Sequence, residues 1–343
     1  MAGYDLYKTN ELIGAIEQGN FQSSSLFIKL FFKKEFLSEA RDISLDLIDV
    51  PEIPIAAFCS PIVGSEVSRD QGFATKNFTP GYLKPKKSID PTKLVARIPG
   101  RALSTTGDKR AALIMSAFQS QIESISARKE WLAVQLVTSG KNIISGEGIE
   151  TYEIDWDMSS KNIITQTVST AWSTQNKESY DPNDDIETYA ENAAAPVNVI
   201  IMGTKVWKLY RQFKAVKSAL DSRRGSSSQL ETALKNLGEY ISFKGYMGDT
   251  AIIVYSGKYF EDKTEKYFLD PMTMVLGNLT HGGLVAYGTI QDTAAAREGL
   301  EVASMYPKNY VVPGEPEVEF MQTHSAPQPI PAGINKFVSV KVA

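Results

Sequence analysis

The chain has 343 residues, 43% of them hydrophobic, so it can bury one or two ordinary cores and is not an intrinsically disordered protein. Acidic residues outnumber basic ones, 40 to 36, which argues against a protein that grips nucleic acid, because such proteins carry a basic excess or a basic stripe. A single cysteine, Cys59, excludes a framework of intrachain disulfides.

The amino-terminal residues predict two short amphipathic helices and then short strands. One helix is expected around 12–16, and a second at 26–32, after a cap at Ser23–Ser25. The second contains Lys29 and is too short to cross a bilayer, so we expect a soluble protein, made in the cytoplasm, with no membrane partner. Proline-broken strands are expected within 42–59. We interpret this part of the chain as an amino-terminal arm.

Residues 60–91 read as an extended ribbon with little to bury, because scattered β-formers alternate with charges, glycines and prolines. A two-stranded ribbon is marginally stable alone in water, so we expect it to lie on a neighbouring molecule. The candidate contact residues are its charged side chains, Glu66, Arg69, Asp70, Lys76, Lys84, Lys86 and Lys87. For any one of them, keeping an exposed edge soluble is an equally good explanation.

Residues 106–139 show the strongest helical pattern in the chain. Apolar residues recur at spacings of three and four, without proline, until Gly140. At 1.5 Å per residue the helix would be a rod of roughly 50 Å. Its single apolar stripe predicts that it backs a sheet along its length; a coiled coil is the alternative, and the lack of a sustained heptad disfavours it.

The remainder predicts a mixture of strands and helices. Hairpin strands are expected within 142–172 and a helix with an acidic first turn at 181–195. The order strand, helix, loop, helix, strand within 196–295 indicates a compact α/β unit. The last residues, 336–343, alternate as a strand would, and we expect them to close the sheet of the first domain. In the Ser/Gly-rich loop at 221–228, Arg223 and Arg224 are weaker candidates for contacts with other subunits.

A search for catalytic and metal sites gives mostly negative results. The two histidines, His281 and His324, lie far from Cys59 in sequence, with no spacing typical of a zinc site or a Cys/His nucleophile pair. The acidic segment 181–192 lacks the glycine and the bidentate glutamate of a calcium loop. The segment 139–142 fails as a phosphate loop. We expect no cofactor and no metal; an enzyme of unrecognised geometry stays open.

Short segments distributed along the chain carry a family resemblance. They are FIKLFF (27–32), SPIVGSEV (60–67), FTPGYLKPK (78–86), YDPNDDIE (180–187), FKAVKSALDSRRGS (213–226), VYSG (254–257), MVLGN (274–278), YGTIQD (287–292), YPKNY (306–310) and FVSV (337–340). In this collinear order they resemble the major capsid protein family of phage lambda and its relatives. The resemblance implies an α+β protein with the tailed-phage capsid fold of the Hong Kong 97 type. Its implied parts are an arm and lead-in strands (1–58), an extended E-loop hairpin (59–95), a peripheral domain (96–195 and 296–343) whose long spine helix is 106–139, and an axial domain (196–295).

The function implied by this resemblance is structural, not enzymatic: a major head protein that self-assembles into hexamers and pentamers of an icosahedral shell around double-stranded DNA. An encapsulin-like compartment shell is the alternative. The implied partners are other copies of the chain, a portal, a scaffold, a maturation protease and a decoration protein at three-fold positions. Packaged DNA would be enclosed without sequence-specific binding. The implied location is the virion, with assembly in the host cytoplasm.

Overall fold

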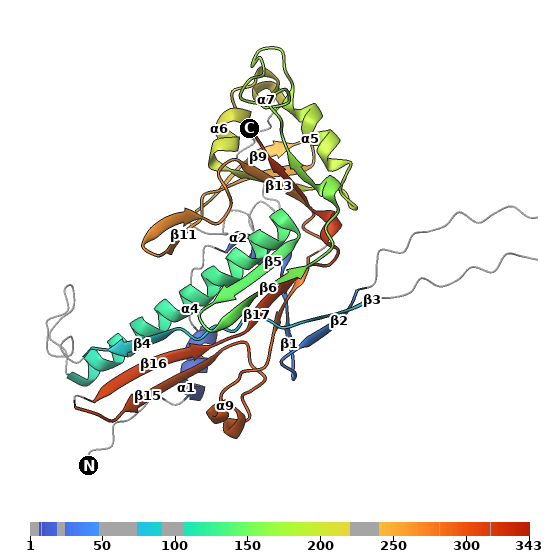
Figure 1. Cartoon of the computed structure of the whole chain (residues 1–343). Coiled ribbons are helices and arrows are strands. Elements are labelled where there is room, and N and C mark those ends of the chain that lie inside the picture. The colour runs from blue at the N-terminus through green and yellow to red at the C-terminus, as the bar shows by residue number, and fades with distance from the viewer. Residues whose placement is uncertain are drawn as a thin grey trace, which may run out of the picture.

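One long helix, α4 (Thr106–Ser139), runs diagonally through the molecule, and the other elements are arranged along it (Figure 1). The computed structural model describes residues 7, 9–18, 25–47, 74–90, 106–219, 240–280, 282–315 and 317–343. The helix spans the residues predicted from the sequence. It ends because Gly140 adopts φ +70° and its amide donates to the Leu136 carbonyl at 2.8 Å. A Cβ at Gly140 would lie 2.3 Å from that of Met158, so only glycine fits this turn.

A mixed sheet of six strands forms the upper part of the molecule in Figure 1. Its strands, in spatial order, are β7 (Ile163–Thr165), β18 (Val338–Lys341), β13 (Thr273–Gly277), β8 (Val199–Gly203), β10 (Thr250–Tyr255) and β9 (Ile241–Met247). β8 pairs in parallel with β10, and β18 with β7, whereas the other pairs are antiparallel. The first and last strands expected within the α/β unit of 196–295 are confirmed as β8 and β10.

Alternate side chains of this sheet enter two different hydrophobic cores. Ile200, Met202 and Ile252 pack with the helices on one face, whereas Ile201 and Ile253 belong to a larger core on the other face. The helices on the first side are α5 (Pro182–Ala190), α6 (Thr204–Tyr210) and α7 (Lys214–Ala219). The predicted acidic helix is confirmed as α5, and the Asn183 amide donates to its N-cap, Asp181, at 2.9 Å.

The sequence-based placement of the last strand was wrong. Residues 336–343 were expected to close the sheet of the first domain, but β18 lies between β13 and β7 in the six-stranded sheet. The physical reason is burial, since Val338 and Val340 are fully covered and pack with the strands and helices of this upper unit. Alternation of side chains identified a strand but carried no information about its partner.

Two smaller sheets lie along α4. The first consists of β15 (Tyr306–Val312), β16 (Val318–His324) and β4 (Lys86–Ile89), and the second of β1 (Lys34–Leu37), β14 (Leu284–Tyr287) and β17 (Pro327–Ile330). In the first, Met321 and Ile89 pack against Ile114, Phe118 and Ile122 of the helix. This half of α4 therefore backs a sheet through one apolar stripe, as predicted.

The remaining elements are short helices and hairpins. They are α1 (Thr9–Gln18), α9 (Thr293–Glu298), the single-turn helices η1 (Ser160–Asn162) and η2 (Ile334–Lys336), and the hairpins β5–β6 (Lys141–Gly146 and Ile149–Asp155), β2–β3 (Ile43–Leu47 and Ala74–Phe78) and β11–β12 (Lys258–Glu261 and Thr264–Tyr267). Residues 53–59, expected to form a strand, and 229–239 of the helix expected at 229–241 lie outside the described residues. The last residue of that expected helix, Ile241, begins strand β9 instead.

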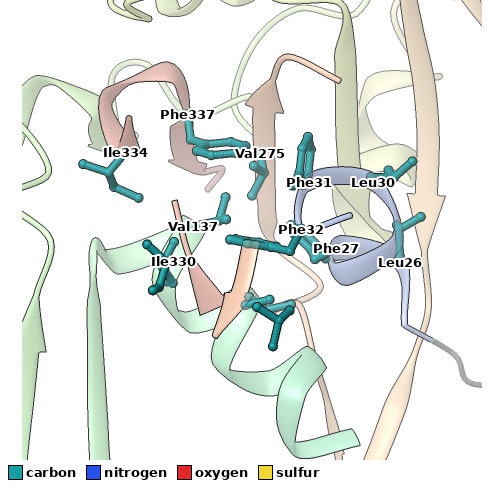
Figure 2. Packing of buried hydrophobic residues seen from close by; sticks show 14 of the residues in the cluster. Leu26, Phe27, Leu30, Phe31, Phe32, Val137, Val275, Ile330, Ile334 and Phe337 are labelled. Atoms are coloured by element: carbon teal, nitrogen blue, oxygen red, sulfur yellow. The ribbon is translucent and has the colours of Figure 1, made fainter. Parts of the chain in front are cut away.

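The short helix α2 (Leu26–Phe31), assigned to an arm from the sequence, lies in the main hydrophobic core. Figure 2 shows Phe31 on the side of this helix toward Val275 and Phe337, and Leu26 and Leu30 on its other side. The rings of Phe31 and Phe337 meet edge to face with centroids 4.9 Å apart. Phe27 and Phe31 are both 0% exposed. Residues 26–32, interpreted from the sequence as part of an amino-terminal arm, therefore complete the hydrophobic core of their own subunit.

The start of α2 is held by Glu130, in the middle of α4. The amides of Leu26 and Phe27 donate to its Oε1 at 2.8 and 2.9 Å, and the amide of Ile28 donates to its Oε2 at 3.1 Å. These are the amides that a helix leaves unpaired at its amino end. Ser25 is the N-cap residue, as predicted, but its side chain makes no capping hydrogen bond. A carboxylate from 104 residues away does so instead.

Burial raises the pKa of Glu130 to about 7, and the backbone amides and a hydrogen bond with Tyr255 limit the rise. Tyr255 belongs to β10, so this one side chain connects α2, α4 and the six-stranded sheet. The carboxyl-terminal half of α4 is correspondingly buried on more than one side, with Leu132, Ala133 and Val134 all covered. The prediction of one apolar stripe along the whole helix is wrong for this half.

Substituting Phe31→Ala should lower the free energy of unfolding by about 3–5 kcal/mol, because it empties a fully covered ring site. Phe36→Ala is the matched control: Phe36 lies on the neighbouring strand β1 and is 50% exposed, so its loss should cost less than about 1 kcal/mol. Urea unfolding followed by tryptophan fluorescence measures both. Equal effects of the two substitutions would show that α2 does not complete the core in solution.

Ionising Glu130 opposes folding, because its pKa is higher in the folded chain than its ordinary value of 4.5. Its contribution to stability is full below about pH 4.5 and falls by about 3 kcal/mol as the pH rises to about 7. Glu130→Gln leaves one amide of α2 without its acceptor, at a cost of about 1–3 kcal/mol, but it cannot ionise. The stability advantage of the original chain over this variant should therefore shrink from pH 5 to pH 8.

Urea midpoints at several pH values measure this gap. Glu123→Gln removes an exposed carboxylate of the same helix and should leave the pH dependence nearly unchanged. A stability difference between the original chain and Glu130→Gln that stays constant with pH would contradict a pKa of Glu130 raised by burial.

Candidate assembly surfaces

The segment expected to contact a neighbour, 60–91, is described only over residues 74–90. Glu66, Arg69 and Asp70 therefore lie outside the described residues, as do Arg223 and Arg224. The described part does bury side chains, since Phe78 and Ile89 are 7% and 6% exposed. The expectation that this segment has little to bury is wrong for this part, which is attached to its own subunit at two places.

The first attachment is the base of the β2–β3 ribbon. Ile43 pairs with Phe78 at the end of the ladder, and both side chains are buried. The ring of Phe78 meets Trp156 edge to face, with centroids 5.4 Å apart. The Tyr152 hydroxyl donates to the carbonyl of Thr79 at 2.8 Å. The base of the ribbon is thus fixed on β6 and on the residue that follows it.

Lys76 of this ribbon forms an ion pair with Asp157 of its own subunit. Asp157 follows β6 and has φ +58°, a left-handed conformation that aspartate tolerates better than most residues. The Asp157 side chain is 75% exposed, against 27% for that of Lys76. An ion pair this exposed contributes little to folding. Its geometry leaves the Asp157 carboxylate open to further contacts.

The second attachment joins residues 82 and 83 to the end of β16. Leu83 and Ser325 exchange two backbone hydrogen bonds, of 2.8 and 2.9 Å. The Tyr82 hydroxyl lies 2.8 Å from Nδ1 of His324 and accepts from the amide of Gln291 at 3.2 Å. The chain segment that leaves the ribbon is therefore bound to a part of the subunit distant from the ribbon's base.

The electrostatics of this second attachment favour uncharged groups. Burial lowers the pKa of His324, and the Asp292 carboxylate, 3.8 Å from Nε2, partly offsets this effect. Burial likewise raises the pKa of Tyr82 to about 12. Near pH 7 a neutral His324 and a neutral Tyr82 hydroxyl therefore share the hydrogen bond. This contact holds the segment in place without a buried charge.

The predicted lysines beyond the ribbon lie in or beside β4, the outer strand of the β15–β16–β4 sheet. Lys86 places its ammonium group 3.8 Å from the ring centroid of Phe320, a cation–π contact within the subunit. Lys84, Lys86 and Lys87 are all exposed. Charged side chains on an outer strand discourage uncontrolled pairing with other strands. The structure thus gathers these three lysines at one sheet edge, separate from the ribbon that carries Lys76.

Sequence reasoning missed the two residues that receive this segment, namely Asp157 and His324. His324 was considered only as a catalytic group and instead holds Tyr82. The partners of Asp157 and His324 lie more than 80 residues away in sequence, so no local pattern indicated them. Asp292, beside His324, caps α9, where the amide of Ala294 donates to it at 2.7 Å.

Within the described residues, no three or more His, Cys, Asp and Glu side chains are grouped so that they could hold a metal ion. None of the described helices is both long enough and apolar enough to span a membrane.

Comparison with known proteins identifies the family. A model of the family described as phage major capsid protein E matches residues 8–342. The major capsid proteins of Escherichia phage lambda and Escherichia phage N15 are 43% and 42% identical to the chain, over 341 and 345 residues; each alignment covers 98% of this chain and 99% of the relative. This identity favours the phage family over an encapsulin-like shell, and the relatives are structural proteins by name rather than enzymes.

The fold is confirmed by solved structures. A prophage capsid protein from Escherichia coli CFT073 superposes with a TM-score of 0.85 at 50% identity, covering 98% of this chain and 99% of the other. The capsid of a native GTA particle shares the fold alone, with a TM-score of 0.50 at 11% identity and coverage of 95% and 92%. The expected α+β phage capsid fold is therefore correct, and the chain belongs to the phage major capsid protein E family.

Proposed function

We propose that this chain builds the wall of a lambda-like phage head by self-assembly into hexamers and pentamers, which close an icosahedral shell around double-stranded DNA. The observation that carries the proposal is the β2–β3 ribbon, whose base is fixed to the body by Phe78 and Tyr152 while 48–73 join its outer ends. Such an element can bind the next copy in a ring, which is a head-to-tail contact rather than a two-fold one.

We propose a structural role for each part of the chain. Residues 1–58 would serve as arm and lead-in, 59–95 as E-loop, 96–195 with 296–343 as peripheral domain, and 196–295 as axial domain. Because α2 is a core element, only the residues before it remain as a proposed arm. β18 also ties the end of the peripheral segment into the axial sheet, so the two proposed domains share a strand.

The proposed partners are other copies of the chain, a portal, a scaffold, a maturation protease and a decoration protein at three-fold positions, with assembly in the host cytoplasm. The formal net charge of −4 suits a wall that encloses DNA without gripping it, because tight phosphate binding requires many compensating lysines and arginines. No sequence-specific contact with the packaged duplex is proposed.

Deleting 52–70 should abolish closed shells while leaving a soluble, folded subunit. The deletion spares β2, β3, Phe78 and Tyr82, which anchor the segment to its own body. Negative-stain microscopy of the purified chain reports shells, and circular dichroism reports folding. Normal particles from a folded deletion variant would contradict the proposal.

Lys76→Gln and Asp157→Asn both break the ion pair within the subunit, and each should change the free energy of unfolding by only about 0.5 kcal/mol. If Lys76 also contacts an adjacent subunit, as we propose, Lys76→Gln should reduce the yield of shells more than Asp157→Asn does. Shell yield measured by sedimentation compares the two. Equal yields would assign Lys76 a role inside its own subunit only.

A further inference from the structure

A row of positive charge lies on the helices α6 and α7, at the upper end of the molecule in Figure 1. Residues 192–219 contain no aspartate or glutamate. In the same segment a lysine or arginine stands at every third position from 205 to 217. We call these side chains the basic stripe: Lys205, Lys208, Arg211, Lys214 and Lys217. The formal net charge of the whole chain is −4, so the net charge gave no sign of this surface.

The fold turns the whole basic stripe toward solvent. All five of its side chains are exposed, whereas the apolar side chains between them, Val206, Tyr210, Phe213 and Val216, are buried in the core on this face of the six-stranded sheet. Residues three apart are neighbours on a helix surface, and like charges at that spacing disfavour the helix slightly. A surface that served only solubility would mix charges of both signs.

The stripe stands on a firmly packed base. Tyr210 is 0% exposed, and its hydroxyl donates to Oδ1 of Asn183 at 2.6 Å. The ring of Tyr210 stacks on Trp172, with centroids 5.7 Å apart. The ring of Phe213 also contacts Trp172, edge to face at 6.3 Å. The backbone that carries the five cations is therefore held in one position.

The charge of the stripe is scarcely compensated by its own subunit. Among the described residues, only Lys214 of the five has a carboxylate partner, Glu178 at 3.8 Å. Those two side chains are 73% and 79% exposed, so this ion pair is weak. The acidic helix α5 lies on the other side of the upper unit from α6 (Figure 1). By contrast, several lysines elsewhere form ion pairs, namely Lys76, Lys141, Lys258, Lys266 and Lys308.

The composition of this surface favours nucleic acid over protein as the partner. The centres of protein interfaces are rich in aromatic residues and poor in lysine. Neither α6 nor α7 has an exposed large hydrophobic side chain among its described residues. Interfaces with nucleic acid are instead polar and strongly positive. Lysine binds phosphate oxygens as a point charge, without a fixed orientation. The stripe therefore fits a polymer of phosphates.

We propose that the basic stripe binds the phosphate backbone of duplex DNA without reading its sequence. The binding itself is independent of the proposed function, whereas the identification of the duplex as the packaged genome rests on it. If all five cations contact phosphates, the logarithm of the association constant should fall with the logarithm of salt concentration with a slope of about −4.5. Such a contact is weak at physiological salt, so it agrees with a wall that does not grip DNA.

Fluorescence anisotropy of a short labelled duplex of mixed sequence tests the proposal. The purified full chain is titrated into the duplex at about 50 to 200 mM salt, below the protein concentrations that give shells. The test variant combines Lys205→Gln, Lys208→Gln and Lys217→Gln, three exposed side chains whose loss should leave the circular dichroism spectrum unchanged. Its affinity at the lowest salt should be about tenfold lower or less, and its slope should be about −2.

A second variant makes the same change in net charge elsewhere. Lys34, Lys87 and Lys263 are also exposed, and they lie in β1, in β4 and in the turn of β11–β12. These elements are separate from α6 and α7 in Figure 1. Replacing all three lysines with glutamine should leave the affinity and the slope nearly unchanged, because a duplex bound at the stripe does not contact them.

Three outcomes would overturn the inference. The first is no binding of the duplex by the full chain at low salt. The second is an equal loss of affinity in the two triple variants, which would mean that only net charge matters. The third is a loss of shells from the stripe variant with unchanged affinity for the duplex, which would assign the surface to a contact between proteins. All three leave the proposed function standing, whereas failure of the unmodified chain to form shells would overturn that function and leave the duplex measurement valid.

Discussion

The carboxylate of Glu130 is the interaction on which the arrangement of the subunit depends. It accepts from three amides at the start of α2 and contacts Tyr255 of β10, so one side chain joins the amino-terminal segment, the long helix and the six-stranded sheet. A buried carboxyl group is costly unless such partners surround it. Because Glu130 accepts from the first three amides of α2, moving either partner would leave buried polar groups of the other without these hydrogen bonds. This mutual requirement fixes where α2 docks, and α2 completes the core with Phe27 and Phe31.

A second polar chain fixes the neighbouring strand to the same helix. The ammonium group of Lys129 donates to the Tyr287 hydroxyl at 3.1 Å, and that hydroxyl donates to Glu35 at 2.9 Å. Burial lowers the pKa of Lys129, and Glu35 counteracts this effect. Adjacent residues of α4 thus hold α2 and β1 through separate networks. The helix therefore acts as a rigid frame, and the β2–β3 ribbon and the β11–β12 hairpin project from it with defined positions.

The helices and strands that local sequence patterns specify were predicted correctly. The features that depend on contacts between residues distant in sequence were missed. The bounds of α4 were predictable because apolar spacing and Gly140 are local signals, and so were β8, β10 and α5. The cap of α2 was not, because Glu130 lies 104 residues away. The same limit explains β18, whose alternation was evident but whose partner, β13, was not. The attachments of residues 74–90 depend on Trp156 and His324, which lie far from this segment in sequence and gave no local signal. Resemblance to a family supplied the fold that these nonlocal contacts produce.

A head-to-tail contact has a consequence for rings of different size. In the proposed rings each copy would give one such contact and receive one, whatever the number of copies, so the same contact serves a pentamer and a hexamer. The change in angle between neighbours must then be absorbed outside the frame, because Glu130 and the core around Phe31 leave little freedom inside it. Weak single contacts of this kind also favour accurate closure, because a misplaced subunit can leave before many contacts accumulate.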